Sequence, residues 1–217
     1  MTPLININKK GTIVIGTMRC GSNLVVALAA KKLIELEMSY QFNGEYFFDI
    51  TQKPTMRHPK YAYFNMLNHL QEINNDTYSI GTIIYPKLKD MIAYNYETWF
   101  WCNQNFHLVK IIRKDYIKHF MSQCIFQFSG QQYGVTNINE IKMPIPYRPN
   151  LHEINSFIGN VLEVVRFPCH NILEYENLPN EPVGHTTKNM YNIEPQDFFA
   201  DYEQVSELLS TLKYNLP

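Results

Sequence analysis

Residues suited to binding a phosphate-like anion stand together near the start of the chain, in the stretch RCGSN (19–23). The planar fork of Arg19 matches the oxygens of a phosphate or sulfate group. Gly21 lets the backbone approach such a group closely, and the side chains of Ser22 and Asn23 can donate hydrogen bonds to it. These residue types in this order favour the binding of a phosphate group.

A strand and a helix are expected to position these residues. Residues 12–17, TIVIGT, form a short β-branched run that predicts a strand buried on both faces. Leucines recur near helical spacing from Asn23 to about Met38, which predicts an amphipathic helix. A helix that begins just after a strand offers backbone N–H groups and the positive end of its dipole, so it favours an anion. The alternative is that Ser22 or Asn23 only caps the helix.

Two other kinds of phosphate loop do not match this stretch. In a Walker loop a lysine follows the second glycine, whereas Ser22 follows Gly21 here, so a magnesium–nucleotide P-loop is disfavoured. A phosphatase loop would pair Cys20 with an arginine about six residues later, where Val26 stands. We therefore predict that Cys20 is a small packing residue.

A second candidate anion site follows the strand pattern FHLVKIIR (106–113). Arg113 ends this predicted strand, and Ser122 lies on the helical pattern that comes next. Ser122 is more than two helical turns further along, so a phosphate shared by both residues requires the intervening turn to fold back. The alternative is an ordinary arginine at a strand end and a serine that bonds to backbone or solvent.

Strands alternate with helices along the rest of the chain. Strand patterns cover residues 78–86 and 171–175, and helical patterns cover residues 151–166 and 195–212. This order predicts an α/β fold in which a parallel sheet with right-handed crossovers is flanked by helices, with ligands at the carboxyl ends of the strands. Residues 39–59 and 129–149 look irregular, and we expect these loops to frame a substrate mouth.

Composition narrows the class of protein. A chain of 217 residues and 25.6 kDa predicts one domain spanning residues 1–217. A net charge of −1 offers no overall field for nucleic acid or anionic membranes. No stretch approaches the roughly 20 apolar residues of a membrane span, so we expect a cytoplasmic protein without an integral membrane segment. The scattered cysteines predict free thiols; the oligomeric state stays open.

These motifs resemble those of sulfotransferases that use 3′-phosphoadenosine 5′-phosphosulfate (PAPS). RCGSNL (19–24) resembles the RxGSTLL form of their 5′-phosphosulfate loop. IIRKDYIKHFMSQ (111–123) resembles their 3′-phosphate motif, with the arginine-to-serine spacing of the bacterial trehalose-sulfotransferase branch. LEYENL (173–178) is similar to the YEDL element, and KNMYNIEPQDFFADYEQV (188–205) is similar to the C-terminal region of the family.

The resemblance implies a P-loop-like sulfotransferase fold and a role for each matching residue. It implies that the 5′-phosphosulfate is held by the backbone of Arg19, Cys20, Gly21, Ser22, Asn23 and Leu24. It also implies that Arg113 and Ser122 hold the 3′-phosphate and that Tyr175 lies near the adenine. The chain departs from the family at Cys20, which replaces serine or threonine, at Asn23, which replaces threonine, and at Thr82, which replaces a lysine.

The implied reaction moves a sulfuryl group from PAPS to a hydroxyl of a small molecule, such as a carbohydrate or glycolipid. Arg19 and the helix N-terminus would neutralise the leaving group, and the reaction requires no metal. We predict Glu45 as the base, because GEYF (44–47) resembles the segment that carries the proposed catalytic glutamate in the trehalose branch. Neighbouring aromatic residues would raise the pKa of its carboxyl, which suits proton abstraction. The alternative is an exposed loop glutamate.

Other readings of the sequence remain open at this stage. His58, His69 and His107 are rival bases, since histidine serves in other sulfotransferases. Aromatic residues of the irregular stretches could stack on a sugar acceptor, namely Tyr46, Phe47, Tyr133 and Tyr147. The chain could instead be a nucleotide-dependent phosphotransferase or kinase, although the missing loop lysine counts against it, or a non-catalytic protein with a degenerate nucleotide-binding fold.

Overall fold

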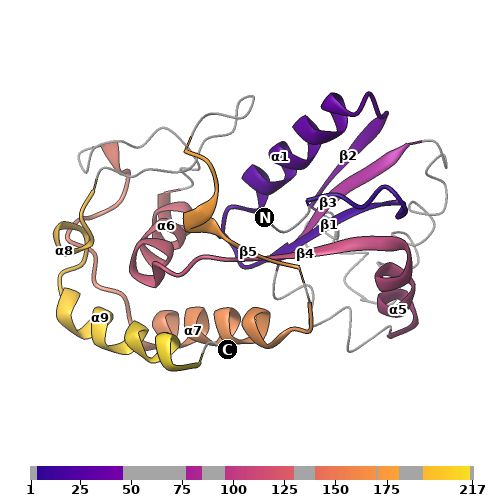
Figure 1. Ribbon diagram of the computed structural model, residues 1–217. Helices are drawn as coiled ribbons and strands as arrows, with labels where there is room; N and C mark the ends of the chain where they lie inside the picture. Colours follow the sequence, from indigo (N-terminus) through magenta and orange to yellow (C-terminus); the bar gives the residue numbers. More distant parts are fainter. Residues whose placement is uncertain are drawn as a thin grey trace, which may run out of the picture.

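Parallel strands form the centre of the molecule (Figure 1). The computed structural model describes residues 4–45, 77–84, 96–129, 140–169, 171–180 and 193–215. Within these ranges the sheet has five strands in the order β2-β3-β1-β4-β5. Their bounds are β1 (Gly11–Gly16), β2 (Tyr40–Glu45), β3 (Tyr78–Ile84), β4 (Phe106–Ile112) and β5 (Ile172–Glu174). Every described pairing is parallel, which confirms the predicted α/β sheet.

The central strand is β1, which pairs with β3 on one side and with β4 on the other. All of its residues are buried, as the β-branched run predicts. The chain leaves β1 toward the β3 and β2 side, whereas it leaves β4 toward β5. Neighbouring strands whose connections run in opposite directions form a topological switch point, and ligands of open α/β sheets bind there. The carboxyl ends of β1 and β4 are therefore the expected place for a site.

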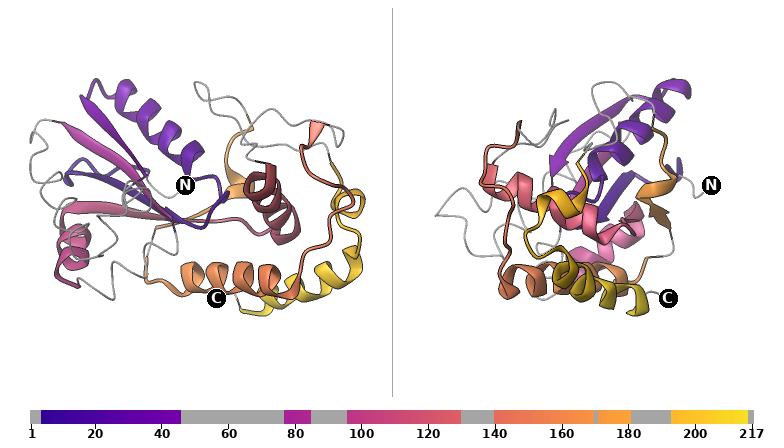
Figure 2. Two further views of the ribbon diagram at one scale, coloured as in Figure 1. Left: turned by 180° about the vertical axis from the view of Figure 1, so that it is seen from behind. Right: turned by 90° about the vertical axis from the view of Figure 1, so that its left-hand side faces the viewer.

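Helices cover both faces of this sheet (Figure 2). Helix α1 (Ser22–Glu35) lies on one face, where Leu24, Val25 and Leu33 pack with residues of β1, β3 and β4. The other face carries α7 (Leu151–Arg166), which begins with a capping box, a typical signature of a helix N-terminus. The remaining helical elements are α5 (Tyr96–Asn105), α6 (Tyr116–Ser129), α8 (Pro195–Phe198), α9 (Tyr202–Ser210) and the 3₁₀ turns η3 (Tyr175–Asn177) and η4 (Thr211–Asn215). In the described ranges no helix combines the length and the apolar character that crossing a membrane requires.

The prediction of an irregular stretch from residue 39 onward is wrong at its start, because residues 40–45 form β2. Tyr40 aligns with Tyr78 of β3, and Glu45 aligns with Thr82 after a register shift. Pairing with β3 therefore imposes an extended backbone on a segment whose own sequence contains no β-branched run. Glu45 is the last residue of a strand, where a loop position was expected. Residues 46–59 lie outside the described ranges.

The prediction of one closing helix over residues 195–212 is also wrong. Helix α8 ends at Phe198, and Phe199 has an extended backbone with φ −96° and ψ 128°. The N–H of Ala200 donates to the carbonyl of Tyr147, and the N–H of Tyr147 donates to the carbonyl of Phe198. These bonds form a short parallel bridge that replaces helical hydrogen bonds, so the helix stops and α9 begins at Tyr202.

Candidate functional site

Both predicted anion-binding arginines lie at the carboxyl ends of β1 and β4. Nη1 of Arg113, just after β4, makes a long contact of 3.5 Å with the carbonyl oxygen of Arg19 in the turn after β1. The Nε of Arg19 donates to the hydroxyl of Ser122 on α6 at 3.3 Å. The structure thus brings together Arg19, Arg113 and Ser122 from the two predicted motifs, and it does so at the switch point of the sheet.

The turn that carries Arg19 has a backbone of alternating handedness. Arg19 has a φ of 63° and Gly21 has a φ of 98°, whereas the φ of Cys20 between them is not positive. The N–H of Cys20, between these two positions, donates to the Thr17 carbonyl at 3.3 Å and so closes the turn on itself. A non-glycine residue in the left-handed region costs about 1–2 kcal/mol, so tertiary contacts must hold Arg19 there.

The start of α1 is open to an anion. Its N-cap is Gly21, no side chain makes a cap hydrogen bond, and no acidic residue lies in the first turn. The alternative in which Ser22 or Asn23 is the N-cap is therefore wrong: Ser22 is the first helical residue. Asn23 is exposed, whereas the side chain of Leu24 is buried in the core, so Leu24 can face the site only with its backbone.

Cys20 points away from the site and into the packing between β1 and α1. A Cβ added to Gly16 would lie 2.3 Å from Cys20 Sγ, so the sulfur occupies the space that this glycine leaves open. Burial raises the pKa of the Cys20 thiol to about 11, although hydrogen bonds from Ser22 oppose the rise. At neutral pH the thiol stays protonated and is not a nucleophile. A hydroxyl at this position would point inward in the same way.

Tyr175 lies between the start of α1 and the second arginine. Its ring centroid is 4.6 Å from the guanidinium carbon of Arg113. A Cβ added to Gly21 would lie 2.4 Å from Tyr175 Cδ2, so the ring also rests directly on the N-cap glycine. The side chain is 7% exposed. Tyr175 thus packs between the start of α1 and Arg113 and supports both.

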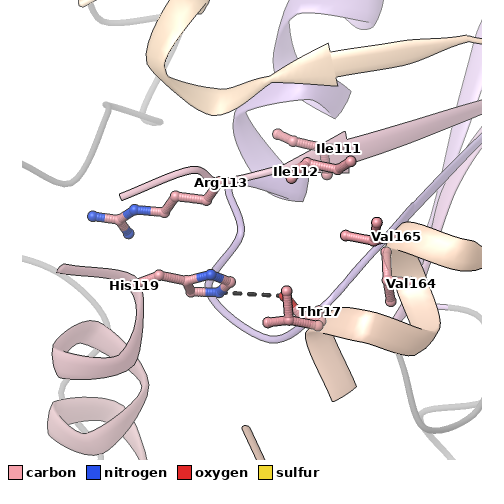
Figure 3. A pocket seen from close by; sticks show the side chains of 8 residues that line it. Thr17, Ile111, Ile112, Arg113, His119, Val164 and Val165 are labelled. Atoms are coloured by element: carbon pink, nitrogen blue, oxygen red, sulfur yellow. Dashed lines mark hydrogen bonds between the residues drawn. The ribbon is translucent and has the colours of Figure 1, made fainter. Parts of the chain in front are cut away.

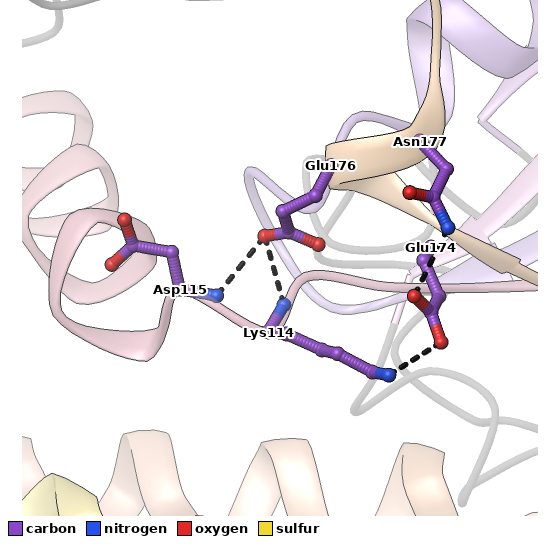
Figure 4. Close-up of polar contacts among 5 residues, drawn as sticks. All are labelled: Lys114, Asp115, Glu174, Glu176 and Asn177. Atoms are coloured by element: carbon purple, nitrogen blue, oxygen red, sulfur yellow. Dashed lines mark hydrogen bonds and ion pairs between the residues drawn. The ribbon is translucent and has the colours of Figure 1, made fainter.

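Polar contacts on either side of Tyr175 fix its position (Figure 4). The Glu176 carboxylate accepts hydrogen bonds from the backbone N–H groups of Lys114 and Asp115, each at 3.0 Å. Lys114 forms an ion pair with Glu174, whose other oxygen accepts from the Asn177 amide at 3.1 Å. These contacts fasten η3 to the turn between β4 and α6. In the sequence, only the acidic residues on either side of Tyr175 indicated such contacts.

A buried histidine that the sequence analysis left without a role supports the same turn. Nε2 of His119 on α6 lies 2.8 Å from the Met18 carbonyl oxygen and 3.3 Å from Thr17 Oγ1. A carbonyl can only accept, so Nε2 carries the proton. Burial, followed by the charge of Arg113, lowers the pKa of His119 to about 3. The imidazole is therefore a neutral donor at physiological pH.

His119 and Arg113 also line a small cavity behind the strand ends (Figure 3). Its volume is about 10 Å³, which is close to the space of one water molecule. The other lining residues are Thr17, Ile111, Ile112, Val161, Val164 and Val165. A nucleotide cannot enter a space of this size, so a bound nucleotide would have to lie on the outer side of the two arginines.

The depressed pKa of His119 predicts acid sensitivity. In the unfolded chain His119 has its usual pKa of about 6.5 and binds a proton below that pH, whereas in the folded protein it stays neutral down to about pH 3. The free energy of unfolding therefore falls as the pH drops from about 6.5 toward about 3. The limiting slope is about 1.4 kcal/mol per pH unit. We expect the free energy of unfolding of His119→Gln to fall less steeply with acid, by up to this slope. Urea unfolding from about pH 7 to about pH 4 measures the difference; parallel curves would contradict it.

The proposed base stands at the same edge of the sheet as the arginines. Glu45 aligns with Thr82, which aligns with Val14 of β1. Because β3 lies between β2 and β1, the backbone of Glu45 is two strand spacings, roughly 10 Å, from β1. Its assignment as a base stays a prediction.

The rival bases and acceptor contacts fall in different places. His107 is buried near the amino end of β4, at the edge opposite the arginines, so it is not a base for this site. His58 and His69 lie outside the described ranges, as do Tyr46, Phe47 and Tyr133. Tyr147 donates to the Glu153 carboxylate and packs against Phe128 and Phe198, so its ring serves the core rather than a sugar.

No family model matches this sequence, and no curated protein matches it significantly. The uncapped start of α1 and two arginines from separate strand ends can together neutralise an anion of more than one negative charge. A ligand that bears two phosphate-like groups suits two such cations better than a single inorganic ion does.

Proposed function

We propose that the protein is a PAPS-dependent sulfotransferase with a P-loop-like sulfotransferase fold, and that it moves a sulfuryl group to a hydroxyl of a small-molecule, carbohydrate or glycolipid acceptor. The observation that carries the proposal is the meeting of Arg19 and Arg113 at the β1–β4 switch point. The lack of a side-chain cap on α1 and the left-handed Arg19 support it, because both features suit an anion at this turn.

In this proposal the two motifs divide the nucleotide between them. The backbone from Arg19 to Leu24 receives the 5′-phosphosulfate, and Arg113 with Ser122 receives the 3′-phosphate. Ser122 is buried and accepts from the Arg19 side chain, so its own O–H can still donate to a phosphate. Tyr175 holds the Arg113 guanidinium in place beside the adenine.

The transfer itself is an in-line displacement at sulfur. The acceptor hydroxyl oxygen forms a bond to sulfur while the bond from sulfur to the 5′-phosphate oxygen breaks, and its electron pair leaves with 3′-phosphoadenosine 5′-phosphate. Arg19 and the first N–H groups of α1 stabilise the charge that develops on that phosphate oxygen. Glu45 takes the hydroxyl proton, so the products are a sulfate ester, the nucleotide and a protonated carboxyl group.

Calorimetric titration with 3′-phosphoadenosine 5′-phosphate tests the proposal. We expect micromolar binding that is at least about tenfold tighter than that of 5′-AMP, because the second arginine adds a charge-assisted contact to the 3′-phosphate. Arg148→Gln is a matched control, since it removes a positive charge from an exposed arginine that pairs with Asp201 on the surface. Failure of the wild-type protein to bind would refute the proposal, and tighter binding of magnesium–ATP would point to a phosphotransferase instead.

A further inference from the structure

We propose that His119 is a positioning residue for the anion-binding turn: it holds the Met18 carbonyl and thereby keeps Arg19 in its left-handed backbone conformation. The consequence of this role for nucleotide affinity rests on the proposed function. The contact itself stands on the structure alone. His119 lies within the second motif, between Arg113 and Ser122, but the resemblance gives it no role.

His119 fixes the peptide group before Arg19. The Met18 carbonyl and the Arg19 N–H belong to one planar unit, so a donor that fixes the direction of the carbonyl also fixes the direction of the N–H. His119 Nε2 supplies that donor at 2.8 Å. Arg113 makes its long contact with the next carbonyl, that of Arg19. Donors from α6 and from the end of β4 therefore hold two successive peptide groups of the strained turn.

The imidazole of His119 is held rigidly by its surroundings. The His119 side chain is 1% exposed, and its ring meets Phe157 of α7 edge to face at a centroid distance of 5.0 Å. Its Nε2 also lies beside Thr17, the residue that follows β1. Figure 3 shows the ring reaching from α6 toward Thr17, next to the Arg113 side chain. A donor packed in this way is preorganised, because it loses little further freedom when a ligand binds.

Helix α6 holds Arg19 at two points. His119 and Ser122 are three residues apart on this helix and therefore share a face. His119 fixes the peptide group before Arg19, while Ser122 accepts from the Arg19 side chain. Helix α6 thus sets both the backbone and the side chain of the residue that would face the 5′-phosphosulfate.

A catalytic role for the same histidine does not fit these contacts. Its Nε2 proton is already donated to a backbone carbonyl, and its Nδ1 is buried without a hydrogen-bond partner in the described part of the chain. An acceptor hydroxyl outside the arginines cannot reach either nitrogen. A neutral donor also avoids placing a third positive charge beside Arg19 and Arg113. His119 therefore acts through Arg19 and does not touch the reacting atoms.

Two substitutions test this role through the affinity for 3′-phosphoadenosine 5′-phosphate. His119→Phe keeps a ring but removes the donor, and we expect its affinity to be about tenfold weaker. His119→Gln offers an amide N–H at a similar reach, so its affinity should stay within about threefold of the wild type. In an Arg19→Ala background His119→Phe should have no further effect, since the residue that it positions is gone. An equal loss in both backgrounds, or no loss from His119→Phe, would overturn the inference.

Nuclear magnetic resonance of the free protein tests the contact without any nucleotide. We expect the His119 ring to carry its proton on Nε2, and we expect the amide resonances of residues 19–22 to move in His119→Phe while that of Leu33 does not. A proton on Nδ1, or unmoved turn resonances, would overturn the inference even if the nucleotide binds. If the wild-type protein binds no nucleotide, the proposed function fails, and this measurement still decides whether His119 positions the turn.

Discussion

Arg19→Gly and Arg19→Ala should both weaken binding of 3′-phosphoadenosine 5′-phosphate by about a hundredfold, which is the loss expected when a charge-assisted contact is removed. The two variants should differ in stability, however. Glycine adopts a φ of 63° without strain, whereas alanine retains the penalty of the left-handed region. We therefore expect Arg19→Gly to be more stable than Arg19→Ala by about 1 kcal/mol, as measured by urea unfolding.

Glu37 provides the matched control for this pair of variants. It is the other described non-glycine residue with a positive φ, 55°, and it follows the end of α1, far from the arginines. Glu37→Gly should likewise be more stable than Glu37→Ala by about 1 kcal/mol, because glycine is the preferred residue at such a helix end. Neither substitution should change nucleotide affinity. If the Arg19 variants bound as tightly as the wild type, the strained turn would have no part in nucleotide binding.

Gly21→Ala should damage both the fold and the site. The new methyl group would lie 2.4 Å from the Tyr175 ring, and the backbone φ of 98° is unfavourable for any residue with a Cβ. We expect a loss of at least about 2 kcal/mol in the free energy of unfolding, from backbone strain and from the displaced ring together. Nucleotide affinity should also fall by at least about tenfold, because Tyr175 supports the Arg113 guanidinium.

Two further variants separate the causes of this loss. Gly159→Ala is the control for the substitution itself: a Cβ there meets nothing within 4 Å on α7, so we expect the protein to gain up to about 1 kcal/mol. Combining Gly21→Ala with Tyr175→Leu should recover the part of the stability loss that arises from the ring contact. If Gly21→Ala were as stable as the wild type, the close packing of Tyr175 on the N-cap would be refuted.

The strands that carry the site were predictable because their signal is local. A β-branched run before Arg19 and another before Arg113 each form a buried parallel strand, and such strands end at one edge of the sheet. Strand β2 was missed because the alternation of Tyr40 and Phe42 is short and is followed at once by Asn43 and Gly44, a pair typical of turns. Its conformation is decided by pairing with β3, which no local pattern reveals.

The details of the site depend on contacts between distant parts of the chain, and these escaped prediction. The left-handed conformation of Arg19 is maintained by His119 and Arg113, about a hundred residues further along. The inward direction of Cys20 follows from the space above Gly16. The packing of Tyr175 between Gly21 and Arg113 follows from the ion pair and hydrogen bonds of its neighbours. Sequence patterns indicate which residue types are present at a strand end, but they do not specify how those residues interlock.

The pairing of β1 has a consequence for the order of events during folding. Gly11 aligns with Ser79 on one side and with Phe106 on the other, so the middle of the sheet closes only when remote segments meet. Pairings of such high contact order form slowly, whereas α7 with its own capping box can form from neighbouring residues. The arrangement of Arg19 and Arg113 at the ends of β1 and β4 should therefore be among the last features to form on refolding. A ligand that binds only the fully formed sheet would then stabilise the native state by mass action, and so shift late folding intermediates toward it.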